Sequence, residues 1–61
     1  MMKFDYLVVE EVYNEDLELV LKNRGKEGWD LSQMIHYPPT FNTIENYKLI
    51  FKRIIWNEQK N

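Results

Sequence analysis

Acidic side chains are crowded into one short part of the sequence. Within nine positions lie five carboxylates: Glu10, Glu11, Glu15, Asp16 and Glu18. Paired carboxylates can perform general acid–base catalysis, but only in a cleft with little water that separates their pKa values. These residues fall at the end of an expected strand and the start of an expected helix, where the positive end of the helix dipole accounts for them. We therefore predict a solvated acidic edge rather than a catalytic pair.

The chain has one histidine, His36, followed by Tyr37. An imidazole can act as a general base or a metal ligand, and its protonation near neutral pH can tune an interface. A single histidine in a chain without cysteine is weak evidence for either chemistry. We therefore predict that His36 ends a strand on the outer face of a sheet, and that the protein needs neither a metal nor a cofactor.

Basic and aromatic residues alternate near the end of the chain. The set comprises Tyr47, Lys48, Phe51, Lys52, Arg53 and Trp56. Such a pattern can bind phosphates or stack on bases. However, the formal net charge is −2, whereas proteins that clamp nucleic acids are usually basic, and two glycines are too few for a glycine-rich phosphate loop. The net charge and the low glycine count therefore disfavour a nucleic-acid partner. The lysines fit an outer strand whose charges discourage aggregation.

The composition sets further limits. The chain has 61 residues, of which 44% are hydrophobic and 30% charged, so it forms at most one domain. Cysteine is absent, which excludes disulfides, iron–sulfur clusters and thiolate zinc sites. No apolar run is long enough for a membrane span or a signal peptide, so we expect a cytoplasmic protein. Because a domain of this size is marginally stable without staples, oligomerisation is the remaining way to stabilise it.

Three segments rich in β-branched and aromatic residues predict strands. They are residues 3–13, 29–37 and 47–56. Between the first two, apolar residues at helical spacing predict a helix over 15–26, with Asn14 as its N-cap and Gly28 as its stop. We therefore predict an α+β fold: a β-α-β-β domain over residues 1–56, with a mainly antiparallel sheet in the order 1-3-2 and the helix on one face. Residues 57–61 form a polar tail.

Strand alternation predicts which residues share a face. The expected helix-covered face holds Tyr6, Val8, Trp29, Leu31, Ile35, Leu49 and Phe51 against Leu17, Val20 and Leu21 of the helix. The expected opposite face holds Leu7, Val9, Met34, Ile50, Ile54 and Trp56. One helix covers only one face, and a large exposed apolar patch usually marks an interaction surface. We therefore predict a homodimer or a docked partner on the second face; the alternative is an apolar face without a partner.

Three stretches of the chain, KFDYLVVEE, GKEGWDL and YKLIFKR, carry a resemblance to a known family. In this order and spacing they resemble a family of short bacterial and phage proteins, a domain of unknown function. The resemblance covers most of residues 3–53, and EGW followed by an acid and Leu is its most specific part. It implies a β-α-β-β fold and a bacterial, phage or mobile-element source, and it implies no reaction. The chain departs from the family pattern at Arg24 and in its longer proline-containing loop.

The absence of a catalytic constellation, the small size and the apolar second face favour one class of function. We predict a small non-enzymatic protein-interaction module, whose partner is a host protein inhibited by a phage or mobile element. The alternative is a small-ligand binder for a nucleotide-like anion. Its site would lie at a dimer seam lined by His36, Tyr37, Lys52 and Trp56. An enzyme ranks behind both.

Overall fold

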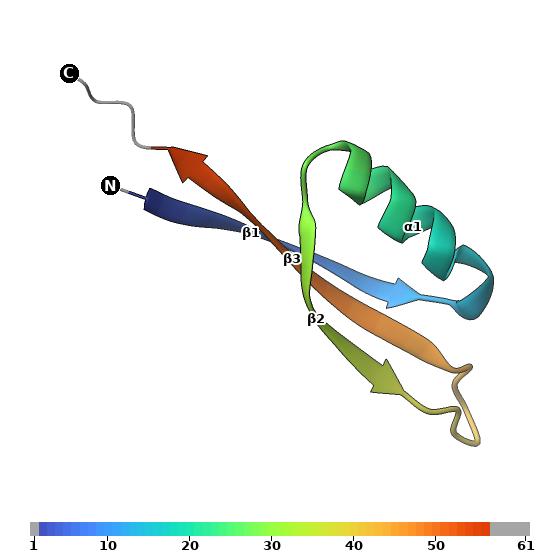
Figure 1. Cartoon of the computed structure of the whole chain (residues 1–61). Helices are drawn as coiled ribbons and strands as arrows, with labels where there is room; N and C mark the ends of the chain where they lie inside the picture. Colours follow the sequence, from blue (N-terminus) through green and yellow to red (C-terminus); the bar gives the residue numbers. More distant parts are fainter. Residues whose placement is uncertain (1, 57–61) are drawn as a thin grey trace.

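The computed structural model describes residues 2–56, which form three strands and one helix. In chain order these are β1 (Met2–Val12), α1 (Asn14–Lys26), β2 (Asp30–Tyr37) and β3 (Asn46–Trp56) (Figure 1). Both β1 and β2 pair antiparallel with β3, which gives the order β1-β3-β2. The predicted α+β fold and strand order are confirmed. The predicted tail lies outside the described residues, and within residues 2–56 no helix is long and apolar enough to span a bilayer.

Both ends of α1 are set by backbone chemistry. Asn14, predicted as the N-cap, is instead the first helical residue, and Tyr13 occupies the N-cap position without a side-chain hydrogen bond. Gly28 has a φ of 90° and, as predicted, stops the helix. Its N–H donates to the carbonyl of Gly25 at 3.0 Å, and the N–H of Trp29 donates to the carbonyl of Arg24 at 3.0 Å. This pair of bonds is a Schellman motif, which leaves Trp29 pointing back toward the sheet.

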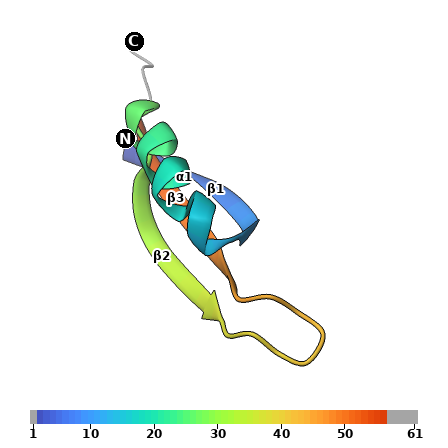
Figure 2. The same ribbon diagram turned by 90° about the vertical axis from the view of Figure 1, so that its right-hand side faces the viewer.

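The core lies where α1 crosses the sheet (Figure 2). Within residues 2–56, the buried hydrophobic side chains are those of Val12, Leu49 and Phe51. The partly buried residues packed against them are Leu7, Val9, Leu17, Val20, Leu21, Trp29 and Tyr47. Two of the three buried residues are on β3, because the central strand has neighbours on both sides. The predicted helix stripe and the predicted core positions of β3 are confirmed.

The predicted faces of β1 are wrong. Leu7 lies opposite Phe51 and Val9 opposite Leu49, so both project toward α1. Tyr6 and Val8, predicted to lie under the helix, are 60% and 50% exposed on the other side. The reason is that β1 carries apolar residues on both faces, so its alternation is compatible with either orientation. The pairing with β3 chooses between them, because directly opposed residues share a face.

A bulge near the end of β1 brings Val12 to the same face as Val9. From Val9 to Val12 the strand advances three residues, whereas its partner advances two, from Leu49 to Tyr47. Glu11 within this segment has a φ of 57°, in the left-handed region. The extra residue places Val9 and Val12 on the same face, where both pack into the core. Without the bulge, Val12 would project away from α1.

A second irregularity changes the faces of β2. Leu31 lies opposite Phe51 and Gln33 opposite Ile50, so β2 has one residue more than β3 between these pairs. Met34 consequently lies opposite Leu49 on the helix side, and Ile35 lies opposite Lys48 on the other side. The predicted positions of Met34 and Ile35 are therefore exchanged. The inserted residue is the cause of this exchange, because it inverts every later side chain of the strand.

Candidate functional site

The face of the sheet that α1 does not cover is the first candidate surface. Its residues follow from the register and are Phe4, Tyr6 and Val8 of β1, Lys48, Ile50, Lys52 and Ile54 of β3, and Ile35 of β2. We call this set the uncovered face. Phe4 lies opposite Ile54, and Val8 lies opposite Ile50, so the apolar side chains form cross-strand pairs. Four of these residues are exposed: Phe4, Tyr6, Val8 and Ile54. The uncovered face is therefore an exposed apolar surface.

A lysine lies inside this surface. The Nζ atom of Lys52 is 5.0 Å from the centroid of the Phe4 ring, a cation–π distance. Lys52 is opposite Tyr6 on one side and Asp30 on the other. These polar groups separate the Phe4–Ile54 pair from the Val8–Ile50 pair. The uncovered face thus offers two apolar patches with a polar row between them.

The predicted interface residues are divided between the two faces. Ile50 and Ile54 lie on the uncovered face as predicted. Leu7 and Val9 are in the core, and Met34 is on the helix side, although it is exposed beyond the end of the region that α1 covers. The backbone of Trp56 pairs with Met2, and the side chain of Trp56 lies outside the described part of the structure.

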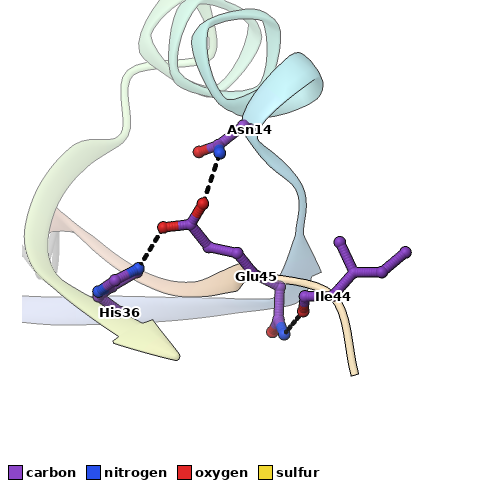
Figure 3. Close-up of polar contacts among 5 residues, drawn as sticks. Asn14, His36, Ile44 and Glu45 are labelled. Atoms are coloured by element: carbon purple, nitrogen blue, oxygen red, sulfur yellow. Dashed lines mark hydrogen bonds and ion pairs between the residues drawn. The ribbon is translucent and has the colours of Figure 1, made fainter. Parts of the chain in front are cut away.

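A polar cluster joins the start of α1 to the end of β2 (Figure 3). Glu45, which directly precedes β3, lies at its centre. One carboxylate oxygen of Glu45 accepts a hydrogen bond from the Asn14 amide at 2.8 Å, and the other lies 2.5 Å from Nε2 of His36. The His36 ring also packs against Tyr47, with 5.0 Å between centroids. Tyr47 contacts the core, so His36 is on the helix side, and its predicted place on the outer face is wrong.

The electrostatics of this cluster fit a structural role. The hydrogen bonds from His36 and then from Asn14 lower the pKa of the Glu45 carboxyl below its ordinary value of 4.5. They stabilise the charged form of the carboxylate. Within residues 2–56, no group of three or more His, Cys, Asp or Glu side chains is arranged to hold a metal ion. The cluster ties a loop to a helix and a strand. No local pattern predicts it, because Glu45 is nine positions after His36.

The acidic residues noted in the sequence do not converge. Glu10, Glu11, Glu15, Asp16 and Glu18 are all exposed. Glu18 forms an ion pair of 3.2 Å with Lys22 one helical turn later, and both side chains are largely in solvent. Such pairs contribute little to stability or chemistry. The arrangement matches the predicted acidic edge.

The residues of the alternative ligand site do not meet within one chain. His36 lies opposite Tyr47 on the helix side, whereas Tyr37 lies opposite Asn46 on the uncovered side. Lys52 is six residues along β3 from Asn46, a separation of roughly 20 Å at about 3.3 Å per residue. Within a single chain, the side chains of His36, Tyr37 and Lys52 therefore do not line a common pocket. Trp56, the fourth member, has its side chain outside the described residues.

The loop between β2 and β3 is the second candidate surface, and the sequence did not single it out as a site. A hollow of about 400 Å³ lies there, lined by Tyr37, Pro38, Thr40, Thr43 and Asn46. Next to it, Phe41 is fully exposed and Ile44 is 73% exposed. The sequence feature that could have indicated this surface is the presence of two apolar residues, Phe41 and Ile44, in a loop where they are not buried.

Comparison with known proteins adds no relative: no family model matches the chain, and no curated protein or solved structure is significantly similar to it. The resemblance to a bacterial and phage family accordingly stays a prediction. The function has to be argued from the two surfaces themselves.

Proposed function

We propose that this protein is a non-enzymatic protein-interaction module that associates with a second copy of itself through the uncovered face. The observation that supports the proposal is the exposed apolar surface formed by Phe4, Val8, Ile54 and their neighbours. Surfaces of this kind on a small chain usually mark a contact site, since exposed apolar area is costly in water.

The shape of the chain supports a second copy as the occupant. The principal axes measure 56 × 18 × 11 Å, and the radius of gyration is 14.8 Å, compared with about 10.5 Å for a compact chain of this length. The molecule is thus one thin sheet with a helix over part of it. A domain buries its apolar surfaces between packed layers, and here the apolar uncovered face has no layer against it. A second copy stacked on the uncovered face, about 10 Å away, supplies such a layer.

The lysines on the uncovered face are compatible with this contact. Lys48 and Lys52 are half-buried and lie on the central strand. Long lysine stems can lie along apolar surface while the ammonium group reaches water at the rim. The ammonium group of Lys52 already lies over the Phe4 ring, so its charge has a partner on this face. The two apolar patches on either side of Lys52 then supply the contact area.

Sedimentation velocity at several concentrations tests the proposal. Val8→Glu places a charge in the middle of the contact, and an unpaired buried charge is strongly destabilising, so we expect the variant to be monomeric at concentrations where the wild type is dimeric. Ile50→Glu should have the same effect. Leu19→Glu is the matched control, because Leu19 is equally exposed but lies on α1. A wild-type protein that stays monomeric at high micromolar concentration would refute the proposal.

The identity of any further partner is a separate proposal. A host protein that the chain inhibits fits the predicted phage or mobile-element source and the exposed apolar side chains of the uncovered face. Such a partner would compete with the second copy for the uncovered face. Addition of that partner would then shift the chain from the dimer into a complex containing one copy of each, and Val8→Glu would weaken both associations.

A further inference from the structure

The loop from Pro38 to Glu45 presents apolar side chains without any charge near its tip. From Tyr37 to Ile44 the sequence is YPPTFNTI, which has no ionisable group apart from the Tyr37 hydroxyl. Phe41 is fully exposed and Ile44 is largely exposed. A phenyl ring in water at the tip of a loop contributes nothing to the core of its own chain. It is therefore available as a contact residue.

Hydrogen bonds hold this loop in one shape. The N–H of Thr40 donates to the carbonyl of Thr43 at 3.0 Å, and the N–H of Thr43 donates to Oγ1 of Thr40 at 3.1 Å. The two threonine hydroxyls are 2.6 Å apart. At the base of the loop, the Asn46 amide donates to the carbonyl of Ile44 at 2.9 Å (Figure 3). A loop that is already ordered loses little entropy when it binds, so Phe41 is a preorganised anchor.

The same loop carries a place for such an anchor. The hollow of about 400 Å³ is lined by Tyr37, Pro38 and three polar residues with short side chains, and Phe41 is not among its lining residues. The Phe41 ring of one copy is therefore complementary to the hollow of a second copy, and the same holds in the other direction. Because each copy offers both, a reciprocal exchange closes as a two-fold dimer and does not extend into a filament.

We propose that the loop is a second self-association site, in which Phe41 of each copy docks into the hollow at Tyr37 of the other. The absence of charge between Tyr37 and Ile44 lets two such loops approach without repulsion. A membrane surface is a poorer fit, since Glu45 ties the loop to the acidic start of α1. This inference does not rest on the contact through the uncovered face.

The size of the contact predicts its strength. A buried phenylalanine removes about 150–250 Å² from water, and the exchange involves two. The total stays below the roughly 1,000 Å² of a stable interface, so we expect weak association. Aromatic anchors dominate such contacts, and removing one should lower the association constant on the order of tenfold or more.

A charge-complementation experiment tests the exchange in full-length protein. Phe41→Asp and Tyr37→Lys are each introduced in a Val8→Glu background, which silences the uncovered face. Each variant alone should fail to associate, because it carries the wrong group in both halves of the exchange. When the two are mixed, one half pairs Asp with Lys and the other half pairs the native Phe41 with the native Tyr37. We therefore expect isothermal titration to detect association only in the mixture.

Controls separate this result from trivial effects. Asn42→Asp puts the same charge on the adjacent exposed position and should leave the association of the Val8→Glu protein unchanged. Circular dichroism checks the fold, and Tyr6→Glu is the second background if Val8→Glu does not fold. Lack of association in the mixture would overturn the proposal. A second outcome would also overturn it. In that outcome the wild type does not self-associate but binds phosphatidylcholine vesicles, and Phe41→Asp abolishes this binding.

Discussion

The carboxylate of Glu45 lies 2.5 Å from Nε2 of His36, although the two residues are nine positions apart and a proline-containing loop lies between them. The same carboxylate accepts a hydrogen bond from Asn14 at the start of α1. One side chain thus joins the end of β2, the start of β3 and the helix. The ring of His36 is at the same time stacked near Tyr47, which belongs to the core. This contact fixes the position of the loop that presents Phe41.

Acidification should loosen this contact. The pKa of Glu45 is below 4.5 in the folded protein, chiefly because of the hydrogen bond from His36. A lowered folded-state pKa means that the carboxylate stabilises the fold at pH values above its unfolded pKa, and that this contribution is lost as the pH falls through the folded pKa. We expect the wild type to lose stability across this acidic window. Glu45→Gln should lose less, when both are followed by thermal unfolding at fixed protein concentration.

Gly25 offers a way to stabilise α1. A glycine within a helix can serve a close approach to a neighbouring element, but a Cβ atom at Gly25 would meet nothing within 4 Å. Its φ is not in the left-handed region, in contrast to that of Gly28. Gly25→Ala should therefore raise the free energy of unfolding by about 0.5–1 kcal/mol, measured by urea denaturation. Gly28→Ala is the control and should destabilise the protein, because its φ is 90°.

Arg53 connects β3 to the end of α1. Its guanidinium lies 4.1 Å from the centroid of the Trp29 ring and donates a hydrogen bond of 3.1 Å to the carbonyl of Glu27. A cation is favoured at the negative end of the helix dipole. Arg53→Ala should lower the free energy of unfolding by about 1 kcal/mol, a figure kept small because the side chain is exposed. Arg53→Lys should recover part of this loss, and an unchanged melting temperature in the alanine variant would contradict the assignment.

The central position of β3 predicts a gradient of amide protection. The strand is hydrogen-bonded on both sides, and its residues Leu49 and Phe51 are fully buried. Hydrogen exchange should therefore be slowest around these two residues. The amides near the bulge at Glu11 should exchange faster, because the ladder is interrupted there. Uniform protection across β1 and β3 would argue against this arrangement of strands.

The sequence alone determined the kind and order of the elements. The β-rich segments, the apolar spacing of Leu17, Val20 and Leu21 and the stop at Gly28 are local signals, because helices and strands differ in period and glycine reaches a positive φ. The order 1-3-2 also followed, since one crossover helix between two strands leaves room for the third between them. These predictions depended on residues close together in the chain, and the structure confirms them.

Tertiary structure decided which side of each strand faces α1 and where the polar residues meet. Alternation could not orient β1, because Val8 and Val9 are equally apolar, and it could not anticipate the extra residues near Glu11 in β1 and between Leu31 and Gln33 in β2. A bulge is a property of two paired strands, so it exists only once the register with β3 is set. The Glu45–His36 contact was invisible for the same reason, because it forms only when the sheet brings distant residues together.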